Sequence, residues 1–350
     1  MADTNVYICG MGAVTPVGLN ARQAAASIRA GLSRSQESDI YDKHFEPFVL
    51  SLVPDEELPP LVKEIEAKVG LTSRQTRLLR LAAPAMQQAM KDIKATDTVP
   101  LLLGAPEPFA DRKPAITDTF LPDFFLQANL ALDESISEVL PLGRASGLVA
   151  MEKAMELIEG GKPYVLVGGV DTYLDLYLLG TLDAENRILG PRVMDGFIPG
   201  EGSAFVLFGK SRPYGESEPI GVLAAAQGFE EGHLYSEETY KGDGLSDAFE
   251  TAFQKRPEPP EIHTVIAGLN GENYGAKEWG VASMRHADCF EGEYRLEHPV
   301  DCTGDVGAAL GPLLAILAAV GLKRGYLDGP CLTWASSDYG TRAAAVIDKA

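Results

Sequence analysis

Short, almost uncharged β-rich runs alternate with helix-like segments along the whole of this 350-residue chain. Apolar runs bounded by Gly, Pro or charged residues are typical of strands that are buried on both faces. Their alternation with helical segments predicts an α/β protein with largely buried sheets. The expected strands are 6–9, 99–103, 164–170, 203–208, 220–225, 264–267, 331–335 and 343–347.

Helical spacing of apolar residues predicts the connecting helices. Thr72 or Ser73 is the expected N-cap of one of them, and Pro84 is expected to kink or interrupt it. The uncharged stretch 306–322 is at the short end for a membrane span, so a helix buried in a soluble core explains it better. The expected helices are 21–32, 72–93, 147–158, 245–253 and 306–322, with loop-rich segments at 33–60 and 105–124.

Strand–helix–strand units occur in both halves, and each half ends in two closely spaced β-rich segments. This recurrence indicates an internal duplication with a join near the Pro-containing segment 209–219. The predicted organisation is an N-terminal half, 1–210, and a C-terminal half, 211–350, packed as one compact unit.

The formal net charge of −20 argues against a nucleic-acid or anionic-membrane partner, because phosphate binding relies on Lys and Arg. An acidic surface fits a basic partner protein, although it more often serves solubility. No basic segment followed by a long apolar one opens the chain, so no secretory signal is expected and the expected location is cytoplasmic. The four cysteines form no CxxC pair and show no metal spacing with the five histidines, so we expect free thiols and no metal.

Four segments, in the right order, resemble β-ketoacyl synthases. Residues 6–18 are close to that family's opening strand and turn, and 147–170 resemble its nucleophile-bearing helix and the next strand. Residues 195–207, DGFIPGEGSAFVL, resemble the segment D-G-F-V-x-G-E-G, and 303–311, TGDVGAALG, resemble T-G-H-x-x-G-A-A-G. Single glycine motifs recur on unrelated folds, but four ordered segments make the chain similar to this family over most of its length.

The resemblance implies a thiolase-like αβαβα layered fold with internal duplication. It also implies a dimer whose core sheet continues across the two-fold axis, and no cofactor. At 350 residues the chain is shorter than a usual synthase, so some cap or acyl-chain-binding loops are expected to be missing. Function does not follow from the fold and has to be argued from the site.

A condensing enzyme of this kind needs a cysteine thiolate at a helix N-terminus and two imidazoles, or an imidazole and an amide, that bind the thioester carbonyl. At the three motif positions this chain has Arg144, Glu272 and Asp305. Arginine stays protonated and cannot accept an acyl group, and an ionised carboxylate cannot donate to an oxyanion. No cysteine lies between Cys9 and Cys289 to replace the nucleophile. The sequence therefore predicts a degenerate triad, no catalytic residues and no Claisen condensation.

Three other features have both a plain and a functional interpretation. Cys302 precedes the Thr-Gly-Asp motif, but a buried cysteine is usually inert packing. Ser146 is a candidate nucleophile near Glu272, but a serine in the first turn of a helix usually bonds the backbone. The run 230–233, Glu-Glu-Gly-His, is expected to be a solvated loop rather than a metal site.

The first functional hypothesis is a catalytically inactive adaptor or scaffold, or the inactive partner of an active synthase in the manner of a chain length factor. Its partners would be a second copy, an active synthase, an acyl carrier protein or effector-type cargo. The alternative is an acyltransferase- or hydrolase-type enzyme with repurposed pocket chemistry on acyl thioesters, using Glu272 or Asp305 as base. A third hypothesis is binding of an acyl or coenzyme A ligand without turnover.

A cation in place of the thiol and carboxylates in place of both imidazoles form the pattern of a buried ion-pair cluster. A helix N-terminus disfavours positive charge, and a buried guanidinium needs a partner. We therefore expect Arg144 within hydrogen-bonding distance of Glu272, Asp305 or both. The opposing expectation is three independent, solvent-facing substitutions in an open cleft.

Overall fold

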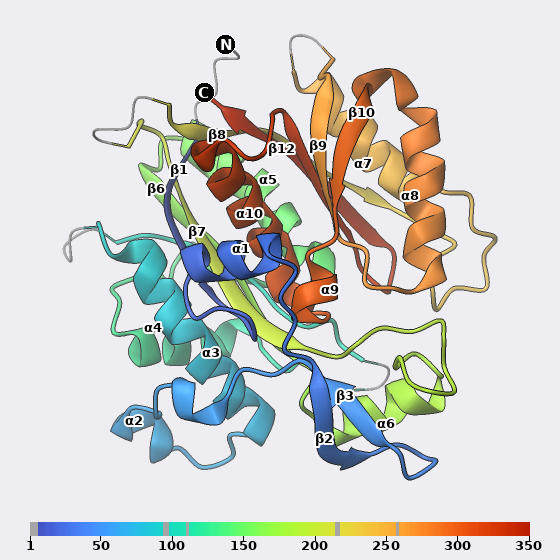
Figure 1. Cartoon of the computed structure of the whole chain (residues 1–350). Helices are drawn as coiled ribbons and strands as arrows, with labels where there is room; N and C mark the ends of the chain where they lie inside the picture. The colour runs from blue at the N-terminus through green and yellow to red at the C-terminus, as the bar shows by residue number, and fades with distance from the viewer. Residues whose placement is uncertain (1–5, 94–97, 110–111, 214–217, 257–258) are drawn as a thin grey trace.

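The computed structural model describes residues 6–93, 98–109, 112–213, 218–256 and 259–350, and its main feature is a ten-stranded mixed sheet (Figure 1). The strand order is β10-β9-β11-β12-β8-β1-β7-β6-β4-β5. β1 and β8 pair through a short contact where Tyr7 lies opposite Gly221, so the sheet consists of two five-stranded halves. The strands are β1 (Tyr7–Val14), β4 (Leu101–Gly104), β5 (Glu138–Leu140), β6 (Tyr164–Thr172), β7 (Glu201–Gly209), β8 (Ile220–Phe229), β9 (Ile262–Ala267), β10 (Phe290–Glu297), β11 (Cys331–Ser336) and β12 (Thr341–Lys349).

The two halves of the sheet have the same topology. From the edge inwards the first has the order β5-β4-β6-β7-β1, and the second has the order β10-β9-β11-β12-β8. The three outer strands of each half are parallel to one another, and the remaining pairs are antiparallel in both. The predicted internal duplication is therefore present, and the chain passes from the first repeat to the second between Gly209 and Ile220.

Helices cover both halves of the sheet and fill the space between them. α3 and α4 pack on the outer face of the first half, α7 and α8 pack on the outer face of the second, and α5 and α10 lie between the halves. This arrangement gives the expected αβαβα layers (Figure 1). The helices are α1 (Ala21–Arg29), α2 (Lys63–Glu66), α3 (Ser73–Met90), α4 (Leu121–Ala128), α5 (Ser146–Glu159), α6 (Leu176–Ala184), α7 (Asp243–Gln254), α8 (Asn273–Arg285), α9 (Val300–Thr303) and α10 (Leu310–Arg324).

The central helices α5 and α10 touch where each begins. A Cβ atom on Gly147 would fall 2.2 Å from Cδ of Pro312, so this close approach requires glycine. The stretch Gly307–Arg324 has the length and apolar composition of a membrane span, but 83% of it is buried inside the protein. It is a helix of the core, as its Gly- and Ala-rich composition indicates.

The segments with the clearest patterns form the expected elements, and the weaker ones differ. Thr72 caps α3 through a capping box with Gln75, but the helix runs unbroken past Pro84, so the expected interruption is absent. Segment 33–60, expected to be loop-rich, contains the hairpin of β2 (Gln36–Tyr41) and β3 (Pro47–Leu50). The loop expected at 105–124 ends inside α4.

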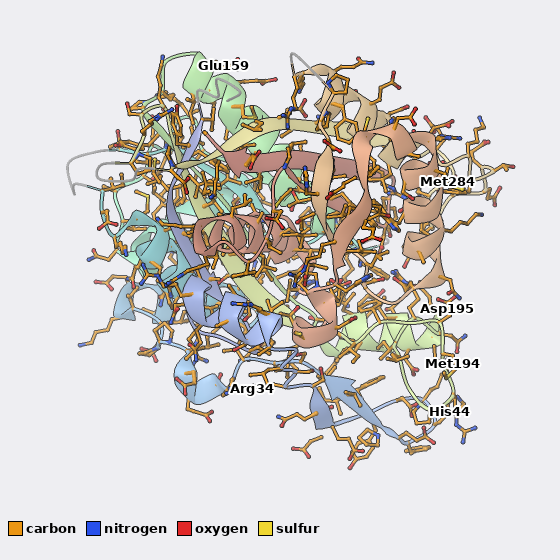
Figure 2. All side chains as sticks on the ribbon, turned by 45° about the horizontal axis from the view of Figure 1, so that its top comes forward. Arg34, His44, Glu159, Met194, Asp195 and Met284 are labelled. Carbon is orange, nitrogen blue, oxygen red and sulfur yellow. The ribbon has the colours of Figure 1, made fainter. Side chains whose placement is uncertain are left out.

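The β2–β3 hairpin packs with α6 into a small lobe beside the main core. The hairpin tip, at His44, and the loop that carries Met194 lie at the same corner of the molecule (Figure 2). Arg192 of that loop pairs with Glu46 of the hairpin at an N–O distance of 3.6 Å. The apolar interior of the lobe contains Phe48, Leu50, Leu178, Leu179, Leu182, Ile188 and Phe197.

The outer edge of the first half-sheet, β5, has its outward N–H groups already engaged. The Leu140 carbonyl accepts a hydrogen bond from the β4 side, so Val139 and its alternate neighbours face outward. The Val139 N–H donates to the Asp118 carboxylate at 2.8 Å, the Ser137 N–H donates to a main-chain carbonyl four residues earlier, and Pro141 has no N–H. Over this described stretch the edge offers no donor to a further strand, although the resemblance implies a sheet that continues across a two-fold axis.

Candidate functional site

Arg144 lies in a 3-10 turn, Gly143–Ala145, directly before α5, where the resemblance places a nucleophile. Its side chain is buried, and Nη1 donates to Asp305 Oδ2 at 2.7 Å. Nε donates to the Ser336 carbonyl at 3.0 Å, and Nη2 donates to Asp338. The ion pair expected between Arg144 and Asp305 is therefore present, and the expectation of solvent-facing substitutions in an open cleft is wrong.

Carboxylates hold the charge of Arg144 against two unfavourable effects. Burial disfavours a charged guanidinium, and a helix N-terminus carries partial positive charge. Burial lowers the pKa of Arg144, but Asp338 and Asp305 outweigh this and raise it above its ordinary value. Burial likewise opposes ionisation of Asp338, but Arg144 and Arg187 lower the pKa of this carboxyl to about 2. The charges of Arg144 and Asp338 therefore persist throughout the physiological pH range.

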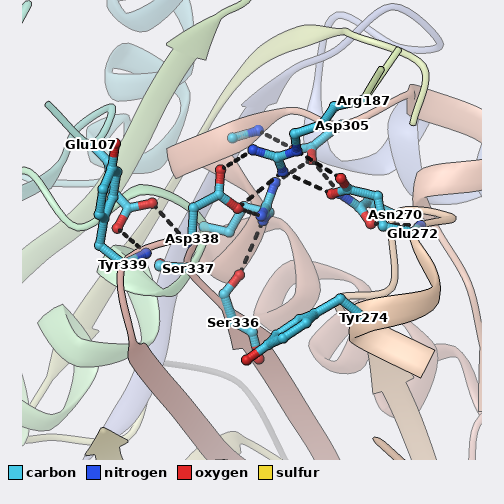
Figure 3. A network of polar contacts seen from close by, with 12 residues as sticks. Glu107, Arg187, Asn270, Glu272, Tyr274, Asp305, Ser336, Ser337, Asp338 and Tyr339 are labelled. Atoms are coloured by element: carbon cyan, nitrogen blue, oxygen red, sulfur yellow. Dashed lines mark hydrogen bonds and ion pairs between the residues drawn. The ribbon is translucent and has the colours of Figure 1, made fainter. Parts of the chain in front are cut away.

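Glu272, the other expected partner of Arg144, pairs with a different arginine, Arg187. Glu272 precedes α8, and Arg187, from the loop after α6, binds both of its oxygens, with Nε–Oε1 at 2.7 Å and Nη2–Oε2 at 2.9 Å. Arg187 Nη1 also donates to Asp338 Oδ2 at 2.8 Å. The planar guanidinium matches a carboxylate in this two-bonded geometry. Asp338 therefore bridges two arginines, and Glu272 joins the cluster through the second of them (Figure 3).

Asn270 links the two carboxylates that replace the imidazoles. Its Nδ2 donates to Glu272 Oε2 at 2.9 Å and to Asp305 Oδ2 at 3.1 Å, and the other oxygen of Asp305 accepts the Gly307 N–H at 2.9 Å. Asp305 is fully buried. Both oxygens of each carboxylate are thus engaged within the chain. A general base needs an oxygen within reach of a substrate proton. Here Asp305 is fully buried, and Glu272 borders a cavity of only about 30 Å³.

The turn between β11 and β12 brings Ser337, Asp338 and Tyr339 to the site, and Glu107 holds the turn in place. Glu107 Oε2 accepts the Asp338 N–H at 2.9 Å, and Oε1 accepts the Tyr339 N–H at 3.3 Å. Ser337 Oγ accepts the Ala145 N–H at 2.9 Å, which caps the turn before α5. Burial and the charge of Asp338 raise the pKa of Glu107 to about 7. Glu107 is therefore a titratable support of the network near neutral pH.

Little space remains beside the network. Two cavities that border Arg144 have about 30 and 40 Å³ of free space, which is enough for a few water molecules at most. An outer cleft of 420 Å³ lies between the start of α3 and α6, and Glu107 alone among the network residues lines it. Pockets for small ligands normally measure several hundred Å³. The outer cleft has such a volume, and the space beside Arg144 does not.

The other candidate residues have structural roles. Ser146 Oγ donates to a main-chain carbonyl three residues earlier at 2.5 Å, as expected for a serine in the first turn of a helix. The Cys302 thiol lies against a main-chain carbonyl, and burial raises its pKa. Glu230 is buried and its carboxylate accepts two main-chain N–H groups, so the expectation of a solvated loop is wrong there.

Four members of the network have no assigned role in the sequence prediction. Residues 337–342, SDYGTR, lie where the family has a C-terminal loop G-F-G-G-T-N, and Asp338 takes the place of its phenylalanine. Asn270 begins the segment that contains Glu272, so both residues lie in segments to which the resemblance points. Arg187 and Glu107 lie in no motif. The sequence could have indicated a second cation in only one way: two carboxylates, Glu272 and Asp305, were expected in the cluster with a single arginine, Arg144.

Comparison with known proteins supports the fold. A chain of a ketosynthase in complex with its chain length factor from Xenorhabdus doucetiae matches with a TM-score of 0.79 at 17% identity, covering 99% of this chain and 98% of that chain. A chain of a complex between a type II polyketide synthase acyl-carrier protein and its ketosynthase, bound to the hexaketide, matches with a TM-score of 0.72 at 15% identity. The match covers 99% of this chain and 99% of that chain. A β-ketoacyl synthase from Burkholderia phymatum matches with a TM-score of 0.69 at 16% identity, covering 100% of each.

No protein-family model and no curated protein sequence matches the chain. At these identities the likeness is one of fold. The chain has the thiolase-like fold of the ketosynthases over its whole length, as the four sequence segments predict. What the chain does has to be argued from its own site.

Proposed function

We propose that this protein is a catalytically inactive ketosynthase-fold protein that acts by binding other proteins, as the inactive partner of an active synthase in the manner of a chain length factor. The observation that carries the proposal is Arg144. It occupies the start of α5, where a condensing enzyme needs its thiolate, and its guanidinium is bonded to Asp305, Asp338 and a carbonyl. A guanidinium has no usable lone pair and cannot hold an acyl group.

The rest of the site supports the same proposal. The positions of both imidazoles carry carboxylates whose oxygens are satisfied by Arg187, Arg144 and Asn270. Such a network stabilises a fixed arrangement and keeps both of these carboxylates engaged with cations and an amide. Complexes of ketosynthases with chain length factors or acyl carrier proteins are among the structures that share this fold, and they favour a synthase or a carrier as partner. Cytoplasmic location, where such complexes would form, is part of the proposal.

The test of inactivity is acyl transfer. The purified protein is incubated with labelled acyl and malonyl thioesters beside an active ketosynthase, and intact-mass spectrometry is expected to show an adduct on the active enzyme only. The variant Cys302→Ala controls for adventitious acylation of a buried thiol. A stable acyl adduct on any cysteine of this chain, lost when that cysteine is replaced by alanine, would overturn the proposal.

The test of partnership is assembly. If the neighbouring genes encode an active synthase, co-expression followed by light scattering is expected to show a 1:1 complex that contains the 37.4 kDa chain. Secretion or effector genes in that position would favour the adaptor form of the proposal instead. A synthase that remains fully active and uncomplexed beside this chain would contradict the partner role.

A further inference from the structure

The tip of the β2–β3 hairpin presents an aromatic side chain to solvent in a backbone conformation that disfavours it. Phe45 is 88% exposed and has a φ of 62°. It closes a turn in which the Phe45 N–H donates to the Asp42 carbonyl at 3.1 Å. Glycine or asparagine normally takes this left-handed position, and for a bulky residue it is a true outlier. Residues kept in such a conformation concentrate at sites of function.

The tip is held rigidly, although its aromatic ring touches little of the protein. The Asp42 carboxylate accepts the N–H groups of His44 and Glu46 at 2.7 and 2.8 Å. Beside it, the Lys43 N–H donates to the Asp183 carboxylate at 2.8 Å, and the Lys43 ammonium donates to the Asp183 carbonyl at 2.6 Å. The turn is thus anchored to the end of α6. A fixed backbone lowers the entropy cost of binding through the exposed ring.

Two other exposed apolar side chains belong to the same lobe. Tyr41, at the end of β2, is 60% exposed. Met194 is 84% exposed on the loop that the Arg192–Glu46 ion pair joins to the hairpin, at the same corner of the molecule as His44 (Figure 2). Scattered exposed apolar residues are normal, but an aromatic with apolar neighbours on one projecting lobe marks an interaction surface.

The rim of this apolar surface is acidic on balance, because its basic groups Lys43 and Arg192 already pair with Asp183 and Glu46. Glu37 and Asp39 alternate with Tyr41 on the solvent face of β2, and Asp195 follows Met194; all three acidic side chains are exposed. Across the described part of the chain, neither Glu37 nor Asp39 has a basic ion-pair partner. Uncompensated acidic groups attract a basic surface and repel anionic lipid headgroups. Charge complementarity therefore favours a protein with basic side chains around an apolar pocket over a membrane.

We propose that Phe45, flanked by Tyr41 and Met194, is the anchor of a docking surface for a partner protein that offers an apolar pocket ringed by Lys and Arg. Aromatic anchors that enter a pocket dominate the binding energy of such interfaces. The surface belongs to the outer lobe and not to the Arg144 network, so the inference stands whether or not the chain is catalytically inactive.

The test uses the full chain in cells of its source organism, with a photo-crosslinking phenylalanine analogue at position 45. A matched control carries the analogue at Val69, which is also fully exposed but belongs to another surface. One protein is expected to be captured at position 45 and not at 69. It is then purified, and its affinity for the full chain is measured by titration calorimetry at low and at moderate salt.

Phe45→Ala and Phe45→Gly are expected to weaken that affinity about 30-fold, as for a binding hot spot, and Val69→Ala is expected to leave it unchanged. Affinity should also fall with salt, because the rim is acidic. Phe45→Gly should melt at or above the wild-type temperature, since glycine accepts the left-handed turn; a loss of thermal stability would show that the ring supports the fold instead. Equal capture at 69, no capture at 45, capture of lipid, or full affinity of Phe45→Gly would each overturn the proposal.

Discussion

Helix α5 follows the 3-10 turn Gly143–Ala145, and helix α10 follows the 3-10 turn Gly307–Ala309 at the equivalent place of the second repeat. Both turns begin with a glycine at positive φ, 59° and 53°. In the second turn the central residue is Ala308, whose N–H donates to the buried carboxylate of Asp171 at 3.1 Å. An anion at a helix N-terminus is what the helix dipole favours.

In the first turn the central residue is Arg144, and a neutral hydroxyl, Ser337 Oγ, caps the N–H of Ala145. The cation opposes the dipole and is stable there because Asp305 and Asp338 neutralise it. The fold accepts alanine at this point of the second repeat, so it does not itself require an arginine. The difference teaches that the Arg144 cluster is specific to the first repeat and is not required by the crossing of the two helices.

Replacing Arg144 by alanine, the residue found at the centre of the second turn, should produce the largest loss of stability. Arg144→Ala leaves the fully buried Asp305 without its cation and leaves Asp338 with Arg187 alone, so the free energy of unfolding should fall by about 3–5 kcal/mol. Urea denaturation followed by circular dichroism measures this loss. The variant that combines Arg144→Ala with Asp305→Asn and Asp338→Asn should recover part of it. A loss below about 1 kcal/mol would mean that the cluster is solvated and that the two turns are energetically alike.

Each of the two turns has a carboxylate against its first glycine, Glu107 against Gly143 and Asp171 against Gly307. A pH series on the stability of the protein tests the first of them, Glu107. The pKa of Glu107 is raised from 4.5 to about 7 by burial and by Asp338. An acid with a raised folded pKa contributes stability that is complete below its unfolded pKa and is lost as the pH rises through the folded pKa. Between pH 4.5 and 7 the wild type should therefore lose roughly 2–3 kcal/mol relative to Glu107→Gln. Parallel stability curves for the two proteins would contradict the assignment.

The cap of the second turn should depend on its hydrogen bonds more than on its charge. Burial raises the pKa of Asp171, so its negative charge adds little net stability, whereas its oxygens accept the N–H groups of Ala308 and Thr172. Asp171→Ala should cost about 2 kcal/mol, and Asp171→Asn, which keeps an acceptor, less than about 1 kcal/mol. If both variants lose the same free energy of unfolding, the ion pair between Asp171 and Arg74 would account for the stabilisation instead of the hydrogen bonds.

The two repeats also show which strands can be predicted from the sequence. β6 and β11 lie inside the sheet, and their uninterrupted apolar runs predict them correctly. The edge strands escape prediction because they are not buried on both faces. β5 has three residues, and β10 reads FEGEYRLE with charges throughout. Short or charged edges avoid unwanted pairing, and the same property removes the apolar signal.

The site is predictable where it coincides with a motif. Arg144 and Asp305 stand at positions that the resemblance defines, and electrostatics alone then predicts that they pair. Arg187 is different. It follows α6 and reaches Glu272 and Asp338 only because the loop folds back beside the turn between β11 and β12. Nothing local in the sequence encodes a contact between residues that lie 85 and 151 positions apart.

The equivalent outer edges, β5 and β10, give the smallest expected effect and the sharpest structural test. β10 is long and carries charges that discourage pairing, whereas β5 is closed by Asp118, which accepts the Val139 N–H at 2.8 Å. Asp118→Ala removes one side-chain cap and should lower the unfolding free energy by about 1 kcal/mol. Amide hydrogen exchange should become faster at Val139, while the amides of β10 serve as the internal control.

The same edge decides how the chain pairs with another copy. If the sheet continued across a two-fold axis at β5, one residue of this strand would lie close to its symmetry mate, so single cysteines along β5, such as Glu138→Cys, test the possible registers by disulfide formation under oxidation. Because the Val139 donor is occupied and Pro141 has none, we expect no cross-link in an otherwise wild-type background. A cross-linked dimer of Glu138→Cys, together with unchanged exchange at Val139 in Asp118→Ala, would show that the partner strand displaces Asp118. If no cross-link forms and exchange at Val139 becomes faster in Asp118→Ala, β5 is not a dimer contact and a partner would have to bind another surface. The two sheet edges would then avoid pairing in different ways, β5 through the Asp118 hydrogen bond and β10 through its charged residues.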